Sequence, residues 1–168
     1  MEQKELLLRT VFACMACDGD IAPEEVELIR QMSKKQLFGD VNIDHELNLL
    51  VEEINTKGKE FLKQYLQCVA EQNMTEEEEL QLANVAVQTI REDKKVEYSE
   101  IKFFKVLRSN LKLVTDESLL SKIEGIDENY LAQDIQTDYL QLYNDYFNNA
   151  EIPSLEISVL KYIKYRFY

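Results

Sequence analysis

Twelve residues near the N-terminus, CMACDGDIAPEE from Cys14 to Glu25, contain the side chains best suited to chemistry. The run combines a C-x-x-C pair, an Asp-Gly-Asp turn and a Pro-Glu-Glu sequence that is typical of a helix start. Thiolates ligate metals or exchange disulfides, whereas carboxylates ligate hard cations. Three interpretations are therefore open: a redox motif, a metal-binding loop, or the corner between two helices.

The carboxylates of this run are stronger candidates for a functional site than its thiols. Cation ligands could be supplied by Asp18, Asp20 and Glu25. Gly19 permits the positive φ of a tight turn between the two aspartates, and Glu25 follows Asp18 by seven positions. Oxygen ligands of this kind favour calcium or magnesium over zinc, although the loop is too short for an EF-hand. Without a metal, the same residues form a common Asp-Gly turn and an acidic helix start.

The cysteines are weaker candidates for redox or zinc chemistry. Cys14 and Cys17 lie at the end of a predicted helix, where the helix dipole disfavours a thiolate, and no βαβ pattern surrounds them. Cys68 and His45 complete the inventory of a Cys₃His zinc site, but without zinc-knuckle spacing. We expect Cys14 and Cys17 to be small buried side chains and His45 to be a solvated residue at a helix start.

Hydrophobic periodicity predicts that helices position these residues. The apolar run at 6–17 is typical of a helix that is buried on all sides, and Pro23 is suited to the first turn of the next helix. Thr75 and Glu78 match a capping box at a later helix start. The further helices are predicted at 43–55, 59–71, 76–91, 99–113 and 116–123.

The composition indicates an all-α protein built as a single helical bundle. The 168 residues are 45% hydrophobic, with only four glycines and two prolines, which is typical of a globular helical chain. We expect a helical domain at 1–113 and a C-terminal helical extension at 114–168 that packs on it. Within the extension, 124–138 is predicted to be an irregular connector, and the tyrosine-rich segments 139–148 and 157–168 are expected to dock on the domain.

The charge and the missing motifs exclude several classes of function. A formal net charge of −13 repels phosphate backbones and anionic lipids, so we expect no nucleic-acid binding. The sequence contains no apolar stretch long enough to span a bilayer and no recognisable signal peptide, which predicts a cytoplasmic protein without integral membrane association. It also lacks the common catalytic motifs and has a single histidine, so we expect no enzyme; a metal-dependent carboxylate hydrolase is the least favoured alternative.

A shift of 75 positions aligns the first helix-loop-helix unit with a later one. Asp18 then matches Asp93, and Glu25 matches Glu100. This weak repeat predicts an acidic pole, meaning the two loops that carry Asp18, Asp20, Glu24, Glu25, Asp93, Glu97 and Glu100. Like charges so close repel unless a cation or a basic partner neutralises them. The ammonium groups of Lys94 and Lys95, in the second loop, could also neutralise these carboxylates.

The pattern of a buried helix ending in A-x-D-G-x-I, followed by a helix-opening glutamate, resembles the TerB family of tellurite-resistance proteins and the related N-terminal domain of DjlA-type cochaperones. The matching residues are Ala16, Asp18, Gly19, Ile21 and Glu25, and in the second unit Asp93, Val96 and Glu100. The resemblance covers about residues 5–112. Cys17 stands where the family usually has Ala, and Lys94 where it usually has Gly.

The resemblance implies an all-helical domain built by duplication, whose acidic pole is proposed to bind divalent cations through Asp18, Glu25, Asp93 and Glu100. It also implies a non-enzymatic role in tellurite resistance or in responses to chemical or phage stress. Our leading hypothesis is a module that binds a divalent cation through these four residues and Asp20 and mediates binding to an unidentified protein partner. The alternative is a metal-independent acidic protein-protein interaction domain.

Overall fold

The computed structural model describes residues 1–92, 96, 98–131, 139–153 and 155. These residues contain no strand, so the prediction of an all-α fold is confirmed. The elements follow one another as α1 (Gln3–Ala16), α2 (Pro23–Lys34), α3 (Ile43–Lys57), α4 (Lys59–Glu71), α5 (Glu76–Glu92), α6 (Tyr98–Ser109), α7 (Asp116–Lys122), the 3₁₀ helix η1 (Glu128–Tyr130) and α8 (Tyr139–Asn149).

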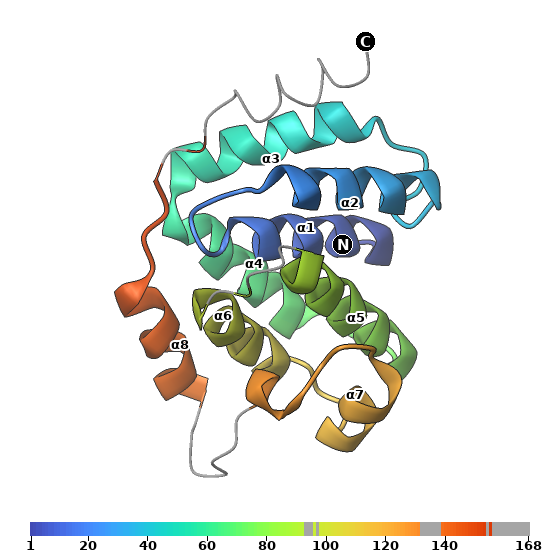
Figure 1. The fold of residues 1–168 in the computed structure, drawn as a ribbon, viewed down its shortest axis with the longest axis vertical. Coiled ribbons are helices and arrows are strands. Elements are labelled where there is room, and N and C mark those ends of the chain that lie inside the picture. Colours follow the sequence, from blue (N-terminus) through green and yellow to red (C-terminus); the bar gives the residue numbers. More distant parts are fainter. Residues whose placement is uncertain (93–95, 97, 132–138, 154, 156–168) are drawn as a thin grey trace.

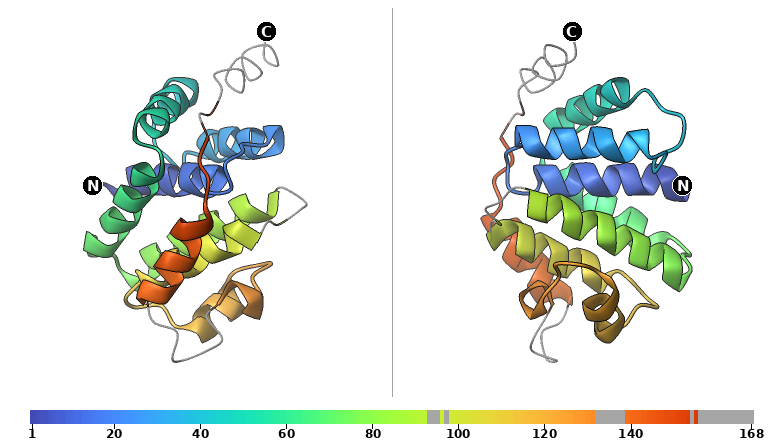
Figure 2. Two further views of the ribbon diagram at one scale, coloured as in Figure 1. Left: turned by 90° about the vertical axis from the view of Figure 1, so that its left-hand side faces the viewer. Right: turned by 45° about the vertical axis from the view of Figure 1, so that its right-hand side comes forward.

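Helix α1 lies at the centre of the bundle. It packs against α4, α5 and α6, and in the ribbon views it lies between α2 and α5 (Figures 1 and 2). Because its sequence is apolar on every side, its side chains are buried nearly all the way round, from Leu6 to Ala16. The prediction of a helix buried on all sides is therefore confirmed.

The predicted helix starts are confirmed by their hydrogen bonds. Pro23 is the first residue of α2, where its missing N–H costs no helical hydrogen bond. The Glu25 carboxylate accepts the Ala22 N–H at 2.9 Å. Before α5, the Thr75 N–H donates to the Glu78 carboxylate at 2.9 Å, and the Glu78 N–H donates to the Thr75 hydroxyl at 3.1 Å, which is a reciprocal capping box.

The prediction that the sixth helix reaches residue 113 was wrong, because α6 ends at Ser109. Beyond it, the backbone N–H groups of Lys112, Leu113 and Val114 donate to the side chain of Glu79 at 3.0, 2.9 and 3.1 Å. Glu79 lies on α5 and is 2% exposed. A carboxylate from another helix thus takes N–H groups that a longer α6 would have bonded to its own carbonyls.

The C-terminal extension packs against α5 and α6 and then crosses to α3. Helix α7 contacts α5, while η1 and α8 contact α6. Tyr130 packs edge-on against Phe104, and Tyr146 lies against Phe103 with ring centroids 5.2 Å apart. After α8 the chain runs along the edge of the bundle (Figure 2), and the predicted docking segment at 157–168 lies outside the described residues.

Replacing Glu79 with Ala should lower the free energy of unfolding by about 3 kcal/mol, because three backbone N–H groups lose a charged acceptor in a buried place. Urea unfolding followed by circular dichroism measures this change. Glu77→Ala is the matched control, since Glu77 is an exposed glutamate in the first turn of the same helix. A loss of equal size in both variants would contradict the role of Glu79.

Candidate functional site

The predicted Asp-Gly-Asp turn joins α1 to α2. One Asp18 carboxylate oxygen accepts the Asp20 N–H at 3.0 Å, and the Gly19 N–H donates to the Ala16 carbonyl at 2.9 Å. Gly19 has φ +83°, as a turn of this kind requires. Asp18 is half-buried and Asp20 is exposed. Of the three interpretations of this loop, the structure therefore confirms the corner between two helices.

Glu25 and Glu100 occupy equivalent places in their helices. Each is the third helical residue, in α2 and α6 respectively, and they are 3% and 1% exposed. The negative charges of both act on the Cys14 and Cys17 thiols, so both carboxylates lie near the C-terminal end of α1. The structure thus brings the two predicted glutamates to one buried region.

The predicted cation ligands do not form a complete group among the described residues. Calcium takes about six to eight oxygen ligands, yet no group of three or more His, Cys, Asp or Glu side chains within the described ranges is arranged to hold a metal. Glu25 and Asp18 already accept backbone N–H groups, and Asp20 is exposed. Asp93 lies outside the described residues, so the five-residue metal site stays a prediction.

The two cysteines of the C-x-x-C pair are buried, as expected. Burial raises the pKa of both thiols well above its usual value, and the nearby Glu25 and Glu100 carboxylates raise it further. The Cys17 thiol donates to the Cys14 carbonyl at 3.2 Å. A neutral buried thiol is a poor nucleophile and a poor metal ligand. His45 is exposed in the first turn of α3, as expected.

A segment far along the chain covers the Asp-Gly-Asp loop, and the sequence did not predict this contact. The Tyr146 hydroxyl of α8 donates to the Cys17 carbonyl at 2.6 Å. A Cβ atom placed on Gly19 would lie 2.6 Å from the Glu151 carbonyl oxygen. These partners are more than 120 positions apart, and no local pattern links them.

The same segment is held at α3 by a pair of hydrogen bonds. The Asn55 side-chain amide donates to the Leu155 carbonyl at 2.8 Å and accepts the Leu155 N–H at 2.7 Å. Residues 150–153 and Lys59 form the other wall of an open recess beside Asp18 and Gly19. The candidate loop therefore lies under a C-terminal strap, meaning the described residues 150–153 and 155, and is not a bare surface loop.

A second concave feature, also missed by the sequence reasoning, lies between α1 and α3. Leu8 and Leu50 form its floor and are each 5% exposed, while Leu49 on its edge is 45% exposed. Its remaining lining residues are charged: Glu5, Arg9, Glu46 and Glu53. The α3 residues 46, 49, 50 and 53 follow helical spacing, which was the available signal.

An ion pair closes one end of this α1–α3 groove. Arg9 donates two hydrogen bonds to Glu53, at 3.3 and 3.4 Å, and Lys57 reaches Glu53 at 3.4 Å. Partial burial acts to raise the pKa of Glu53, but the hydrogen bonds and positive charges of Arg9 and Lys57 lower it overall. The charge of Glu53 is therefore balanced within the protein.

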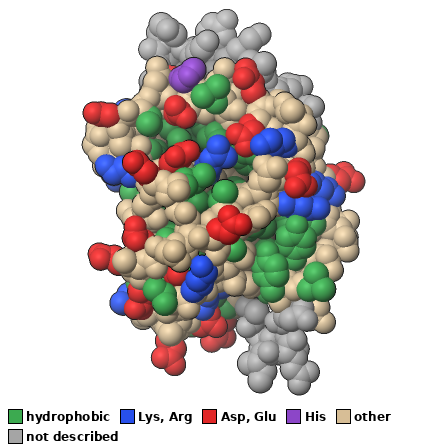
Figure 3. Space-filling model, turned by 180° about the vertical axis from the view of Figure 1, so that it is seen from behind, with side chains coloured by type: hydrophobic (Ala, Val, Ile, Leu, Met, Phe, Trp, Pro, Cys, Tyr) green, Lys and Arg blue, Asp and Glu red, His purple; other side chains and the backbone are tan. Residues whose placement is uncertain are grey.

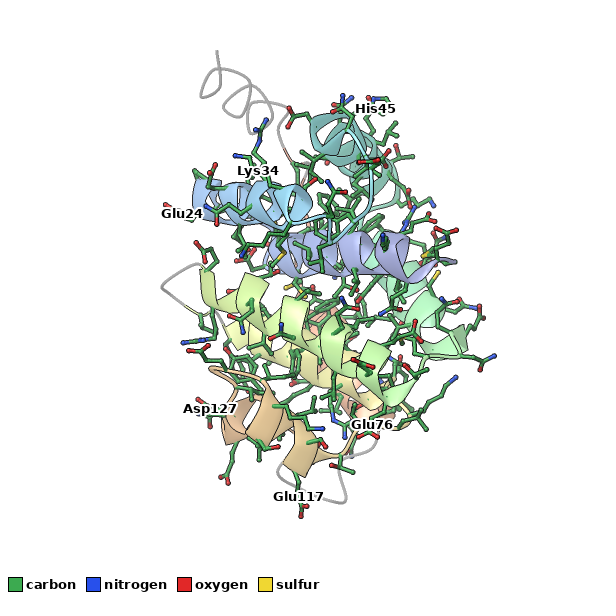
Figure 4. The ribbon with its side chains drawn as sticks, turned by 90° about the vertical axis from the view of Figure 1, so that its right-hand side faces the viewer. Glu24, Lys34, His45, Glu76, Glu117 and Asp127 are labelled. Atoms are coloured by element: carbon green, nitrogen blue, oxygen red, sulfur yellow. The ribbon has the colours of Figure 1, made fainter. Side chains whose placement is uncertain are left out.

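The acidic side chains are spread around the molecule and do not gather at one end. Figure 4 shows Glu24, Glu76, Glu117 and Asp127 on different elements, pointing outward. Figure 3 shows a face on which hydrophobic side chains lie among Asp, Glu, Lys and Arg, with the histidine at its edge. Exposed acidic side chains therefore occur on several elements of the described chain, and on the face in Figure 3 they lie among basic and hydrophobic ones.

No family model, curated protein or solved structure matches this chain. Within the described ranges, no helix combines the length and the apolar character needed to cross a bilayer.

Gly19→Ala should destabilise the protein by about 3 kcal/mol, because alanine is strained at positive φ and its Cβ would press on the Glu151 carbonyl. Gly39→Ala is the matched control: Gly39 has φ +77°, but a Cβ there would meet only the Cδ of the flexible Lys4 side chain, at 3.4 Å, so the change should cost about 1 to 2 kcal/mol. Chemical unfolding measures both values. Equal losses would show that the strap does not press on Gly19.

The stability of the protein should fall as the pH rises above about 8.5, where thiols of the unfolded chain lose their protons. The native pKa values of Cys14 and Cys17 are raised, so the stabilisation is complete below that pH and is lost on alkaline titration. Urea unfolding from pH 7 to 9.5 measures the slope. Cys14→Ala/Cys17→Ala should flatten this slope, and an unchanged slope in the double variant would contradict the assignment.

Proposed function

We propose that this chain is a non-catalytic protein-interaction module that works without a bound metal. It belongs, in this proposal, to the cytoplasmic stress-response systems that the TerB resemblance implies. The observation that carries the proposal is the α1–α3 groove, where an apolar floor is bordered by carboxylates on a protein of net charge −13. Such a surface attracts basic partners and repels nucleic acids.

The buried carboxylates support a non-catalytic role. Catalytic acids and bases must reach a substrate, yet the Glu79 carboxylate holds three N–H groups of the α6–α7 loop and the Glu25 carboxylate holds the Ala22 N–H. The Cys14 and Cys17 thiols are buried and protonated. The buried carboxylates of Glu79 and Glu25 therefore stabilise the backbone, and the two buried thiols pack in the core.

Cation binding is the second candidate, and one observation favours it. Glu25 and Glu100 are buried at equivalent helix positions 75 residues apart, near the same two thiols. A duplicated pair of this kind is what a two-loop cation site of the TerB type would need. Completing it would require Asp93, which lies outside the described residues.

Purification of the tagged full-length chain from its native cells separates these candidates. The metal-independent module should retain a stoichiometric protein partner in the presence of a chelator and lose it when the salt concentration rises from about 0.1 to 1 M, because exposed charge pairs are then screened. Asp18→Asn should leave the partner bound. Loss of the partner with the chelator or in Asp18→Asn would favour the cation-dependent form instead, and the absence of any protein partner would overturn the proposed function.

A further inference from the structure

We infer that the α1–α3 groove binds a helical segment of a partner protein that presents leucine-like side chains next to a lysine or arginine. This inference rests on the proposed interaction function and names the site and the chemistry of the partner. It is argued from the shape of the groove, from its exposed leucine and from an uneven distribution of charge along it.

The shape of the groove suits a short amphipathic helix. The lining residues of α3 run from Glu46 to Glu53, seven positions, which is about 10 Å or two helical turns. A cavity of about 300 Å³ is at the small end of the range for ligand sites and accepts a few side chains rather than a large cofactor. A furrow between two neighbouring helices is a common seat for a third helix.

Leu49 gives the groove an apolar contact that stays exposed among the residues that the structure describes. It is 45% exposed and lies next to Leu8 and Leu50, whose side chains are almost completely buried. A single exposed leucine is ordinary on a protein surface. An exposed leucine at the edge of a furrow floored by two others is a place where an aliphatic side chain of a partner gains buried area.

The two ends of the groove differ in charge. At one end Arg9 of α1 is paired with Glu53 of α3 across the furrow. At the other end Glu5 of α1 and Glu46 of α3 both line the furrow, and no Lys or Arg of the described residues forms an ion pair with either. A partner lysine or arginine placed there would supply the cation that Arg9 supplies at the far end.

This charge pattern decides between the classes of partner. A nucleic acid or an anionic bilayer would bring further negative charge to Glu5 and Glu46, on a chain that already carries −13. A basic amphipathic helix brings the opposite charge together with apolar side chains at i, i+3 or i+4 spacing. The complementary ligand is therefore a protein helix with a leucine stripe and a flanking basic residue.

Fluorescence anisotropy with labelled synthetic peptides and the full-length chain tests this assignment. The probes are 15-residue helical peptides with leucines at i and i+4 and a lysine one turn away, together with versions in which the lysine is replaced by Glu or the leucines by Ser. The parent peptide should bind, and both altered peptides should bind at least about tenfold more weakly.

Variants of the protein locate the binding. Leu49→Ser and Glu46→Lys should each weaken binding of the parent peptide by about tenfold, whereas Leu120→Ser and Glu117→Lys should change it by less than about twofold. Leu120 and Glu117 are exposed residues of α7 and reproduce the same chemical changes away from the groove. Circular dichroism and thermal unfolding check that all four variants remain folded.

In the experiments with the purified protein, three results would overturn the assignment: no peptide of the set binds, the α7 variants weaken binding as much as the groove variants do, or the free chain is a dimer that Leu49→Ser makes monomeric. The last result would mean that a second copy occupies the groove. A native partner that co-purifies equally with wild-type and Leu49→Ser protein would overturn the groove assignment alone. The absence of any native partner would remove the proposed function as well.

Discussion

The architecture depends on the burial of α1 from all sides. A helix without a polar face gains stability only when other helices surround it, and α4, α5 and α6 contact it directly. Its buried Thr10 hydroxyl therefore needs internal partners: it donates to the Leu6 carbonyl at 2.8 Å and accepts the Tyr65 hydroxyl at 2.7 Å. The positions of the loops, the strap and the groove follow from this central helix.

The acidic residues divide into two groups with different physical roles. Glu79 and Glu25 are buried and accept backbone N–H groups, so their charge is stabilised by oriented dipoles and serves the fold. Most of the others are exposed on several elements and are stabilised by water. Only the second group is available to a partner, which is why the proposed interaction uses the surface and not the buried carboxylates.

The C-terminal extension links the two sides of the bundle. Tyr146 bonds to the end of α1 and packs on Phe103 of α6, and Leu155 is held by Asn55 of α3. The corner that carries Asp18 and Gly19 is therefore supported from outside the helix-loop-helix unit to which it belongs. A larger side chain at Gly19 would displace the strap, because the Glu151 backbone carbonyl lies directly against Gly19.

The sequence by itself determined the all-helical class, the central position of the first helix, the start of α2 at Pro23 and the capping box of Thr75 and Glu78. These features depend on periodicity and on contacts within a few residues, which a sequence displays directly. The tertiary structure alone decided where α6 ends, what covers Gly19 and where the groove lies. Each of these depends on a contact between positions that are more than 30 residues apart, such as Glu79 with Leu113, Gly19 with Glu151 and Arg9 with Glu53, and long-range pairings of this kind leave no local signal.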